Sequence, residues 1–360
     1  MKSPLSRCAP SPLRGDATRG LAKPAPRWHS LWQRPLHRHR ARGAALLAAM
    51  LTVTLVATFA AAAMWQQWRA VEVETAERGR VQSTWILIGA LDWSRLILRE
   101  DGRSGGADHL AEPWAVPLEE ARLSTFLAAE NNVSQVDDAS TDTTEAFLSG
   151  QITDMQGRLN ITNLAEGGQV QAVALRQFTR LFERLGLPPQ QLTRLVDGLR
   201  RAQAGVGSDG NTAPLLPPTI TQLTWLGLSP AAVAVLAPHV TLLPVRTPVN
   251  LNTADIDVLM AAIDGMDSAT AQKMVQAREA RHFRTLSEVR DLVGASIDIN
   301  ESAHAVASSY FEVRGRLRLG DAMVDERSLV RKQGIDVTTL WRERGAFDRE
   351  NALATAPPPR

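Results

Sequence analysis

The sequence predicts an α+β protein in which a long N-terminal helix packs on a small antiparallel sheet and helical domains are inserted between the strands. Three observations support this fold class. An apolar, helix-compatible stretch begins at Ala44, and strand-like alternation occupies residues 310–319. Between that strand and an earlier strand region at residues 152–161, the pattern is helical. With 360 residues the chain has room for two or three domains of ordinary size.

A basic leader, residues 1–43, precedes the first helix. It contains ten Lys and Arg and one acid, Asp16, a net charge of +9, so the remaining residues carry −7 of the formal total of +2. The basic charge is therefore confined to the leader and does not indicate nucleic-acid binding by the rest of the chain. One cysteine, Cys8, excludes a disulfide scaffold and a Cys-based metal site.

A membrane segment follows the leader. Residues 44–64 are 21 residues without a charge, and a helix of that length covers about 30 Å, enough to cross a bilayer. Because the flanking positive charge lies on the N-terminal side, we expect the leader in the cytoplasm and the rest across the membrane. A cleaved secretory signal is the alternative, but its apolar region is only about 7–15 residues long.

The same helix is expected to continue to about Arg99, since this stretch has no proline and the glycine-rich residues 101–106 end it. Apolar residues at three- and four-residue spacing predict one buried face in this half, made of Val81, Trp85, Ile88 and Leu91.

The strands of the outer part are expected at both ends of the helical insertion. Residues 152–161 predict a tight hairpin or bulged strand around Gly157. Residues 310–319 alternate clearly and predict a half-buried strand, with partner strands at 328–331 and 337–341.

The insertion contains several helix signals. Residues 175–185 and 192–199 carry apolar helical faces separated by Pro188-Pro189, and residues 205–218 read as a loop. Ser229-Pro230 predicts a helix start. Further on, Thr253 and Ser268 are predicted caps, and residues 285–288 form a capping box. This second group has the pattern of a helix-hairpin-helix module.

The junction Arg42-Gly43-Ala44 resembles the processing site of type IV pilin-like proteins, which a prepilin peptidase cuts after the glycine. Counted from Ala44, the fifth residue is Ala48, where most pilin-like subunits carry a glutamate. The minor pseudopilin family called protein K of the type II (general) secretion pathway lacks this acid, so Ala48 fits that family.

Three further motifs in order resemble the same family. They are the Asp108-His109-Leu110 run with Trp114 to Leu118, the segment 150–164, and the helical segment 251–289. In the second, the matching positions are Asp154, Gly157, Arg158, Asn160 and Asn163. The resemblance extends from Gly43 to about Trp341 and implies a pilin-like unit with inserted SAM-like or helix-hairpin-helix domains.

This resemblance implies a domain layout. We expect a leader (1–43), a long helix (44–100) with its membrane segment (44–64), a first part of the pilin-like domain (101–165), a SAM-like domain (166–245), a helix-hairpin-helix or SAM-like domain (246–305), returning strands (306–345) and a disordered tail (346–360). Since leaders in this family are typically short, the 43-residue leader also suggests a true start nearer Trp28 or later.

The resemblance further implies a function. We expect a minor pseudopilin, not an enzyme, at the tip of the type II secretion pseudopilus, where it initiates or caps the fibre and supports export of folded proteins across the outer membrane. The implied partners are pseudopilins I and J, other pseudopilins, secreted substrates and the prepilin peptidase, with methylation after processing. The implied location is the bacterial inner membrane, single-pass, with a periplasmic C-terminal part.

A membrane-anchored, competence-type DNA-binding protein is the alternative, because helix-hairpin-helix modules also bind DNA. In such modules the hairpin presents backbone N–H groups to phosphate. Here Asp264 and Asp267 occupy that place, and residues 247–293 contain seven acids and five bases, a net charge of −2. This balance opposes phosphate binding, so no nucleic-acid partner is expected.

Catalytic and metal sites are weakly indicated. The sequence has no phosphate loop, nucleophile elbow or HExxH motif, and its seven histidines are scattered. We therefore expect no catalytic residues and no bound cofactor. The acids Asp137, Asp138, Asp142 and Glu145 could offer oxygen ligands to calcium, and the family resemblance also makes calcium a candidate, but no ligand set is assigned.

Overall fold

The computed structural model describes residues 42–125, 146–204, 214–294, 297–320 and 322–345. The chain divides into two compact units, Met1–Ala70 and Val71–Arg360, and the 63-residue helix α1 (Arg42–Ser104) contributes to both. Residues 1–41 of the predicted leader, residues 205–213 of the predicted loop and the predicted tail, residues 346–360, lie outside the described residues.

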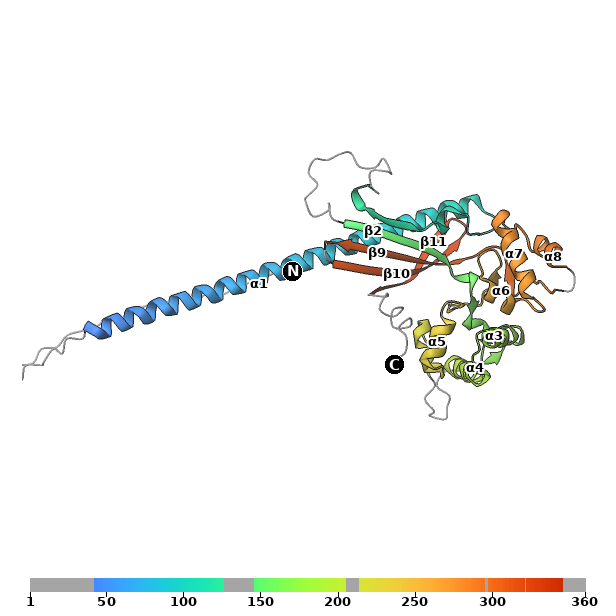
Figure 1. The fold of residues 1–360 in the computed structure, drawn as a ribbon, viewed down its shortest axis with the longest axis horizontal. Coiled ribbons are helices and arrows are strands. Elements are labelled where there is room, and N and C mark those ends of the chain that lie inside the picture. Colours follow the sequence, from blue (N-terminus) through green and yellow to red (C-terminus); the bar gives the residue numbers. More distant parts are fainter. Residues whose placement is uncertain (1–41, 126–145, 205–213, 295–296, 321, 346–360) are drawn as a thin grey trace, which may run out of the picture. The chain divides into compact units, whose positions relative to one another are not determined.

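A five-stranded antiparallel sheet forms the body of the second unit, in the order β1-β2-β9-β10-β11 (Figure 1). Strands β9 to β11 follow one another along the chain as a meander, and β2 pairs along the free edge of β9. The predicted partner strands at 328–331 and 337–341 are confirmed as parts of longer strands. The strands are β1 (Leu118–Arg122), β2 (Ala146–Asp154), β9 (Tyr310–Leu319), β10 (Ala322–Gln333) and β11 (Asp336–Gly345).

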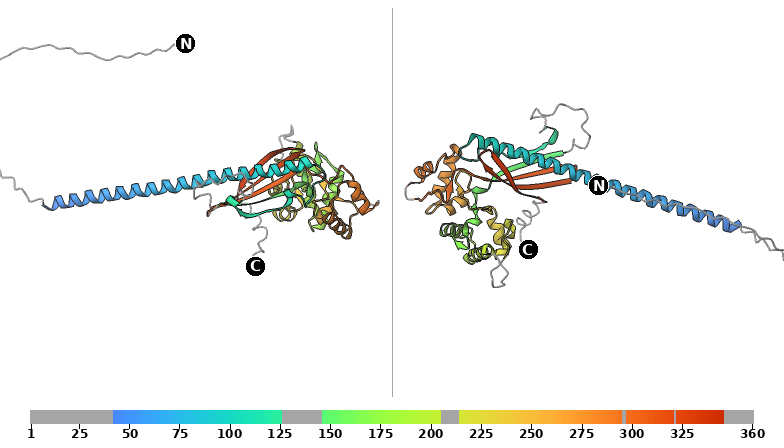
Figure 2. Two further views of the ribbon diagram at one scale, coloured as in Figure 1. Left: turned by 90° about the horizontal axis from the view of Figure 1, so that it is seen from above. Right: turned by 180° about the vertical axis from the view of Figure 1, so that it is seen from behind.

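The second half of α1 lies along one face of this sheet (Figures 1 and 2). Leu91 and Leu98 pack with Phe311 and Val330, and Trp114 meets Phe311 edge-on with ring centroids 5.0 Å apart. Sheet and helix therefore share one apolar interior, as expected for two packed layers.

The buried face of α1 differs from the predicted one. Leu91 is buried, but Val81 and Trp85 are 53% and 68% exposed. The buried face instead includes two serines, Ser83 and Ser94, whose hydroxyls donate to the carbonyl oxygens four residues earlier. Since these hydroxyls are satisfied within the helix, they can be buried at small cost, and hydrophobic spacing alone misplaces the face.

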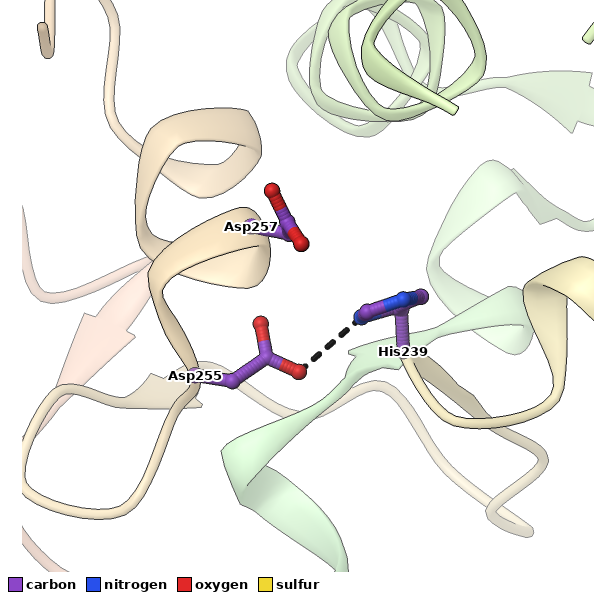
Figure 3. A group of neighbouring side chains, drawn as sticks. All are labelled: His239, Asp255 and Asp257. Carbon is purple, nitrogen blue, oxygen red and sulfur yellow. Dashed lines mark hydrogen bonds and ion pairs between the residues drawn. The ribbon is translucent and has the colours of Figure 1, made fainter. Parts of the chain in front are cut away.

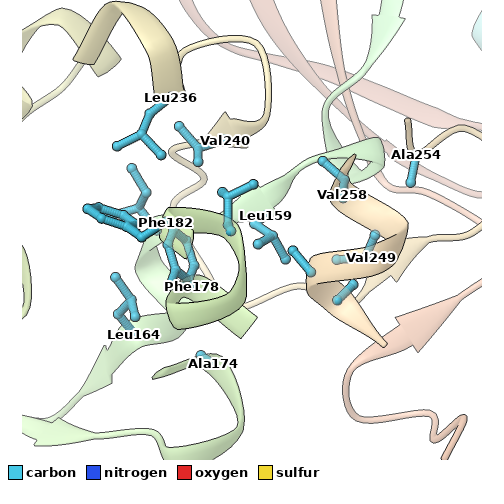
Figure 4. Close-up of a cluster of buried hydrophobic side chains, with 14 of the residues drawn as sticks. Leu159, Leu164, Ala174, Phe178, Phe182, Leu236, Val240, Val249, Ala254 and Val258 are labelled. Carbon is cyan, nitrogen blue, oxygen red and sulfur yellow. The ribbon is translucent and has the colours of Figure 1, made fainter. Parts of the chain in front are cut away.

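Two helical modules occupy the insertion between β2 and β9, and they share one continuous apolar core (Figure 4). Phe178 and Phe182 from the first module and Val258 from the second belong to the same cluster. The helices are α3 (Ala172–Arg184), α4 (Pro189–Ala204), α5 (Pro230–Leu236), α6 (Ile256–Ala262), α7 (Ser268–Ala280) and α8 (Leu286–Val293).

In the described part of the insertion, six two-residue strands link its segments, and three short 3-10 helices flank or interrupt these strands. The strand pairs are β3 (Leu159–Asn160) with β6 (Val240–Thr241), β4 (Ala165–Glu166) with β5 (Gln169–Val170), and β7 (Val249–Asn250) with β8 (His304–Ala305). The 3-10 helices are Met155–Gly157, Ile161–Leu164 and Ile220–Leu226, and a fourth, Pro113–Ala115, precedes β1.

Three local predictions are wrong. The predicted hairpin or bulged strand around Gly157 does not form, because β2 ends at Asp154 and the next strand, β3, pairs with β6 instead. Asp255, not Thr253, caps α6, and Asp267, not Ser268, caps α7. In both cases a carboxylate one or two residues from the predicted cap accepts a hydrogen bond from a backbone N–H in the first turn of the helix. The predicted caps Ser229 and Thr285 are confirmed.

Candidate functional site

The membrane half of α1 presents apolar side chains on all sides. Leu47, Leu51 and Phe59 are each about two-thirds exposed, and no residue of the most apolar window is buried. The hydroxyls of Thr52, Thr54 and Thr58 donate to carbonyl oxygens three residues earlier. A polar group in the hydrocarbon core of a membrane needs a hydrogen-bond partner within the protein. Because each of these hydroxyls has one, the threonines are compatible with a lipid environment. Among the described residues, α1 is long and apolar enough to cross a membrane.

An aromatic pair marks the end of the apolar run. Trp65 and Trp68 lie with ring centroids 5.3 Å apart, and Arg69 and Glu72 follow. Tryptophans are enriched at membrane–water interfaces, so this pair fits the boundary of the membrane segment.

The predicted processing residues lie at the start of α1. Gly43, Ala44 and Ala48 occupy its first turns, their side chains are exposed, and no atom lies within 4 Å of a Cβ built on Gly43. Among the described residues, nothing therefore covers the junction. Cleavage after Gly43 and the part played by Ala48 remain predictions.

A buried carboxylate, Asp154, joins the sheet to the insertion. Its Oδ2 accepts hydrogen bonds from Asn250 Nδ2 (2.9 Å), Thr253 Oγ1 (2.6 Å) and Ser308 Oγ (2.7 Å), and its Oδ1 accepts from Gln156 N (2.7 Å). Burial raises the pKa of Asp154, although each of these donors opposes that shift. The donors come from the end of β2, the second module and the returning chain, so one side chain ties three segments together.

The other residues of the 150–164 motif have structural roles. A Cβ on Gly157 would lie 2.8 Å from Thr253 Oγ1, so only glycine allows this approach. Asn160 donates to the carbonyl of Val245, and Asn163 exchanges two hydrogen bonds with the backbone of Thr247. The motif therefore fixes the segment 243–247, which leads from the first module into the second.

The Asp108 motif makes a second joint at the end of α1. Asp108 accepts from Ser308 N at 2.6 Å and pairs with Lys332, which also contacts Asp101 at 2.5 Å. Burial raises the pKa of Asp108 to about 6. Burial lowers the pKa of Lys332, but the carboxylates of Asp108 and Asp101 together outweigh this effect, so the pKa is raised. This ion cluster fixes α1 to β10.

Glu112 organises the loop after α1. Its Oε2 accepts from His109 N (2.9 Å) and Trp114 Nε1 (2.7 Å). Burial raises the pKa of Glu112 to about 7, and neighbouring Asp101 adds to the shift. The His109 ring stacks on His282 of the second module at a centroid distance of 3.7 Å, and burial lowers the pKa of His109. Body and module thus meet through stacked rings.

A charged clasp joins the two helical modules, and Figure 3 shows its His239–Asp255 contact with Asp257 beside it. His239 Nδ1 lies 2.9 Å from Asp255 Oδ2, Arg184 Nη2 lies 2.5 Å from Asp257 Oδ1, and Arg180 pairs with Asp264 at 3.1 Å. The hydrogen bond to Asp255 raises the pKa of His239, which favours the charged imidazolium in this contact. Cations of the first module therefore face acids of the second.

Two described groups could in principle hold a metal ion, and neither fits calcium. In the first, Asp101, Asp108 and Glu112 converge, but the Lys332 ammonium already neutralises two of these carboxylates. In the second, His239, Asp255 and Asp257 converge, but Arg184 holds Asp257. Calcium takes six to eight oxygen ligands, which neither set provides. The acids Asp137, Asp138, Asp142 and Glu145 lie outside the described residues.

Two carboxylates of the hairpin in the second module occupy the place where a phosphate would bind. Asp267 Oδ1 accepts from Thr270 N at the start of α7, and Asp264 pairs with Arg180. Two of the basic residues nearby are also engaged, since Arg278 donates to the carbonyl of Leu251 and His282 stacks on His109. The module is used for packing inside this protein, which disfavours the DNA-binding alternative.

Sequence reasoning found some of these residues and missed others. The two sequence motifs, the Asp108 run and the segment 150–164, contain Asp108, Asp154, Gly157, Asn160 and Asn163. Lys332, Ser308 and Asn250 complete the two joints but carry no individual signal, because their contacts in these joints are with partners 58 to 231 positions away.

Comparison with known proteins gives a consistent result. Two family models described as type II secretion system protein K match residues 157–245 and 249–307. Type II secretion system protein K of Pseudomonas aeruginosa is 28% identical over 304 residues, covering 78% of this chain and 85% of the relative. The Klebsiella pneumoniae protein of the same description is 26% identical over 342 residues, covering 86% and 98% respectively.

A solved structure has the same fold. It belongs to the GspK–GspI–GspJ complex from the type 2 secretion system of enterotoxigenic Escherichia coli, with a TM-score of 0.59 and 19% identity, covering 75% of this chain and 98% of that one.

An apolar N-terminal helix that continues onto a small antiparallel sheet defines a pseudopilin-type subunit, a structural component with one helix suited to membrane anchoring. The two matched segments lie in the helical insertion that distinguishes this chain from a simple subunit of that type. The chain is similar to type II secretion system protein K over both matched segments, and these comparisons support a minor pseudopilin of that system.

Proposed function

We propose that this chain occupies the tip of the type II secretion pseudopilus, where it initiates or caps the fibre and supports export of folded proteins across the outer membrane. The observation that carries the proposal is Ala48 in a membrane helix that lacks any acid from Ala44 to Met64. In subunits with glutamate at this position, the acid pairs with the N-terminal amine of a neighbour, since a lone carboxylate in hydrocarbon is costly. A subunit without the acid needs no such neighbour above it.

The insertion supports the same position. Residues 155–309 add two helical modules at one end of the sheet (Figure 1). Several independent contacts hold these modules to the body, including the Asp154 network and the His109–His282 stack. A bulky, firmly attached outer part would block addition of a further subunit beyond it, and it would be placed to meet secreted substrates.

Pseudopilins I and J are the partners we propose. The structurally similar chain comes from a GspK–GspI–GspJ complex, which supports a corresponding assembly here. Small residues allow close approach of membrane helices, and the segment offers Ala44, Ala45, Ala48, Ala49 and residues 60–63 for this contact. Other pseudopilins would then join below this complex.

The proposed topology is a single pass through the bacterial inner membrane. The leader would lie in the cytoplasm, where a prepilin peptidase would cut between Gly43 and Ala44, and residues beyond the membrane segment would lie in the periplasm. The exposed first turns of α1 support access to the junction.

We propose domain boundaries close to those expected, with one change. The apolar core of the insertion begins at Leu159, and one family model begins at residue 157, so the first inserted domain starts there rather than at residue 166. The second spans about 246–305, and the sheet resumes at β9.

The mature N-terminus tests the proposal. The full chain is purified from cells with and without the prepilin peptidase, and its N-terminal peptide is identified by mass spectrometry. We expect an N-terminus at Ala44, with methylation, only when the peptidase is present. An intact leader in both strains would remove the pseudopilus mechanism. Crosslinking of the processed chain to pseudopilins I and J then tests the tip complex separately.

A further inference from the structure

A pocket lies between the sheet-bound half of α1 and the inner face of the sheet. Its volume is about 220 Å³, and its walls come from α1, the loop 113–118, β2, β9 and β10. Apolar side chains dominate the lining, among them Leu91, Ile97, Trp114, Leu118 and Leu148. Close-packed protein interiors have few voids larger than a water molecule, so a pocket of this size is a distinct feature of the fold.

Small residues on both layers keep the pocket open. Gly150 and Gly315 are register partners on β2 and β9, and both lack side chains. Ala90 and Ser94 line the same pocket from α1. A Cβ on Gly315 would make only ordinary contact with Leu87, 3.4 Å away. The sheet would therefore tolerate a larger residue here, and sterics do not demand the glycine.

The charges beside the pocket are already paired. Glu326 is 4% exposed, and its two carboxylate oxygens contact Arg342 at 3.1 Å and Arg344 at 2.5 Å. Arg314 pairs with Glu312 at 2.5 Å. No uncompensated charge is therefore offered to an ionic ligand, and apolar cavities of similar size bind molecules such as benzene.

We infer that this pocket is a binding site for a neutral, mainly apolar molecule the size of one or two aromatic rings. Trp93 and Trp114 are among the lining residues, and aromatic side chains offer a large apolar contact area to a ring. The ligand would fill the space between helix and sheet, so its binding would stabilise the body of the protein against separation of α1. This role is independent of fibre assembly.

The test uses the full chain in lipid nanodiscs with 5-fluoroindole as probe, followed by fluorine NMR. We expect saturable line broadening with the wild-type chain beyond that of empty nanodiscs. Ala90→Leu fills the pocket from α1 and should weaken binding by about tenfold or more. Ala76→Leu is the matched control, because it places the same side chain on an exposed position of the same helix, outside the pocket.

A second variant protects the test against misfolding. Gly315→Ala adds a single methyl group at a site with room for it, so it should weaken probe binding while leaving the circular dichroism spectrum unchanged. Equal binding by wild type, Ala90→Leu and Gly315→Ala would overturn the inference. The inference would also be overturned if the probe signal with the wild-type chain were identical to that with empty nanodiscs. The pocket would then hold water or a side chain of a partner subunit instead.

Discussion

Asn250 donates a hydrogen bond from Nδ2 to Asp154 Oδ2 at 2.9 Å, across 96 positions of sequence. The same amide nitrogen lies 3.0 Å from Ser308 Oγ, which itself donates to Asp154. The sheet, the entry to the second module and the return from it therefore meet at a single carboxylate. This geometry makes the helical insertion a fixed part of the body.

Replacing this carboxylate should loosen the insertion. Asp154→Ala removes the acceptor of four hydrogen bonds, three of them buried, and we expect a loss of about 2–4 kcal/mol in the free energy of unfolding. Thermal unfolding of the solubilised full chain measures it. Asp291→Ala, at an exposed position, should change the melting temperature little. Equal melting temperatures for both variants would contradict the assigned role of Asp154.

The end of α1 packs directly against the turn between β10 and β11, with no room for a side chain at Gly102. A Cβ on Gly102 would lie 2.0 Å from the carbonyl oxygen of Gly334. Gly102→Ala should therefore destabilise the protein by about 1–3 kcal/mol, the usual range for overpacking. Gly89→Ala is the matched control: nothing lies within 4 Å of its Cβ, so the better helix former should raise stability by about 0.5–1 kcal/mol. Shifts of the same sign in both melting temperatures would refute this contact.

The orientation of α1 on the sheet can be tested with two side chains. Leu91 is 3% exposed and Trp85 is 68% exposed. We expect Leu91→Ala to cost about 2–4 kcal/mol, the range for a buried large-to-small change, and Trp85→Ala to cost under about 0.5 kcal/mol. Chemical denaturation of both variants gives the comparison. A larger loss for Trp85→Ala would restore the face that the apolar spacing predicts.

The sequence predicted the elements better than their contacts. The length of α1, strand β9 and its two partners, and the helical insertion follow from periodicity and breakers, which are local properties. The buried face of α1 was misjudged, because Ser83 and Ser94 count as polar in the sequence yet satisfy their hydroxyls inside the helix. The end of β2 was misjudged, because the pairing of β3 with β6 is set by a segment 81 residues away.

In the candidate site, too, the sequence identified some residues but not their contacts. The motifs pointed to Asp108, Asp154 and Asn160 before any contact was known, but not to what they do. Lys332 could not be found, because an isolated lysine on a strand gives no sign that it will meet two acids near the end of α1. Residues that act through distant partners are visible only after the chain is folded.

The loop after α1 should make stability depend on pH. Burial raises the pKa of Glu112 from 4.5 to about 7, so between these values the folded chain holds a proton that the unfolded chain has released. Stability from this group is therefore highest at low pH and falls as the pH rises through about 7. His109 has a lowered pKa and acts in the opposite sense below 6.5.

Glu112→Gln isolates the contribution of this carboxyl. Glutamine keeps an oxygen acceptor for the N–H groups of His109 and Trp114 and resembles the protonated acid. It should raise the melting temperature at pH 8 by about 3 °C or more, with the gain disappearing near pH 5. Melting curves at intervals of pH measure this, and Glu279→Gln, at an exposed position, is the control. A gain that stays constant with pH would show that ionisation of Glu112 is not its cause.

The proposed tip position makes a prediction about the membrane helix itself. If the chain has no subunit above it, Ala48→Glu introduces an acid near the start of the helix that no assembly step requires, and secretion should remain close to wild type. Leu55→Glu is the contrasting variant, because an acid deeper in the apolar segment costs about 2.5–3.5 kcal/mol on insertion and should lower the amount of membrane-inserted chain. Secretion of an exported enzyme and immunoblots of the membrane fraction measure both. Complete loss of secretion with normal amounts of the Ala48→Glu chain would contradict the tip position, because it would mean that the fifth residue must be apolar for assembly.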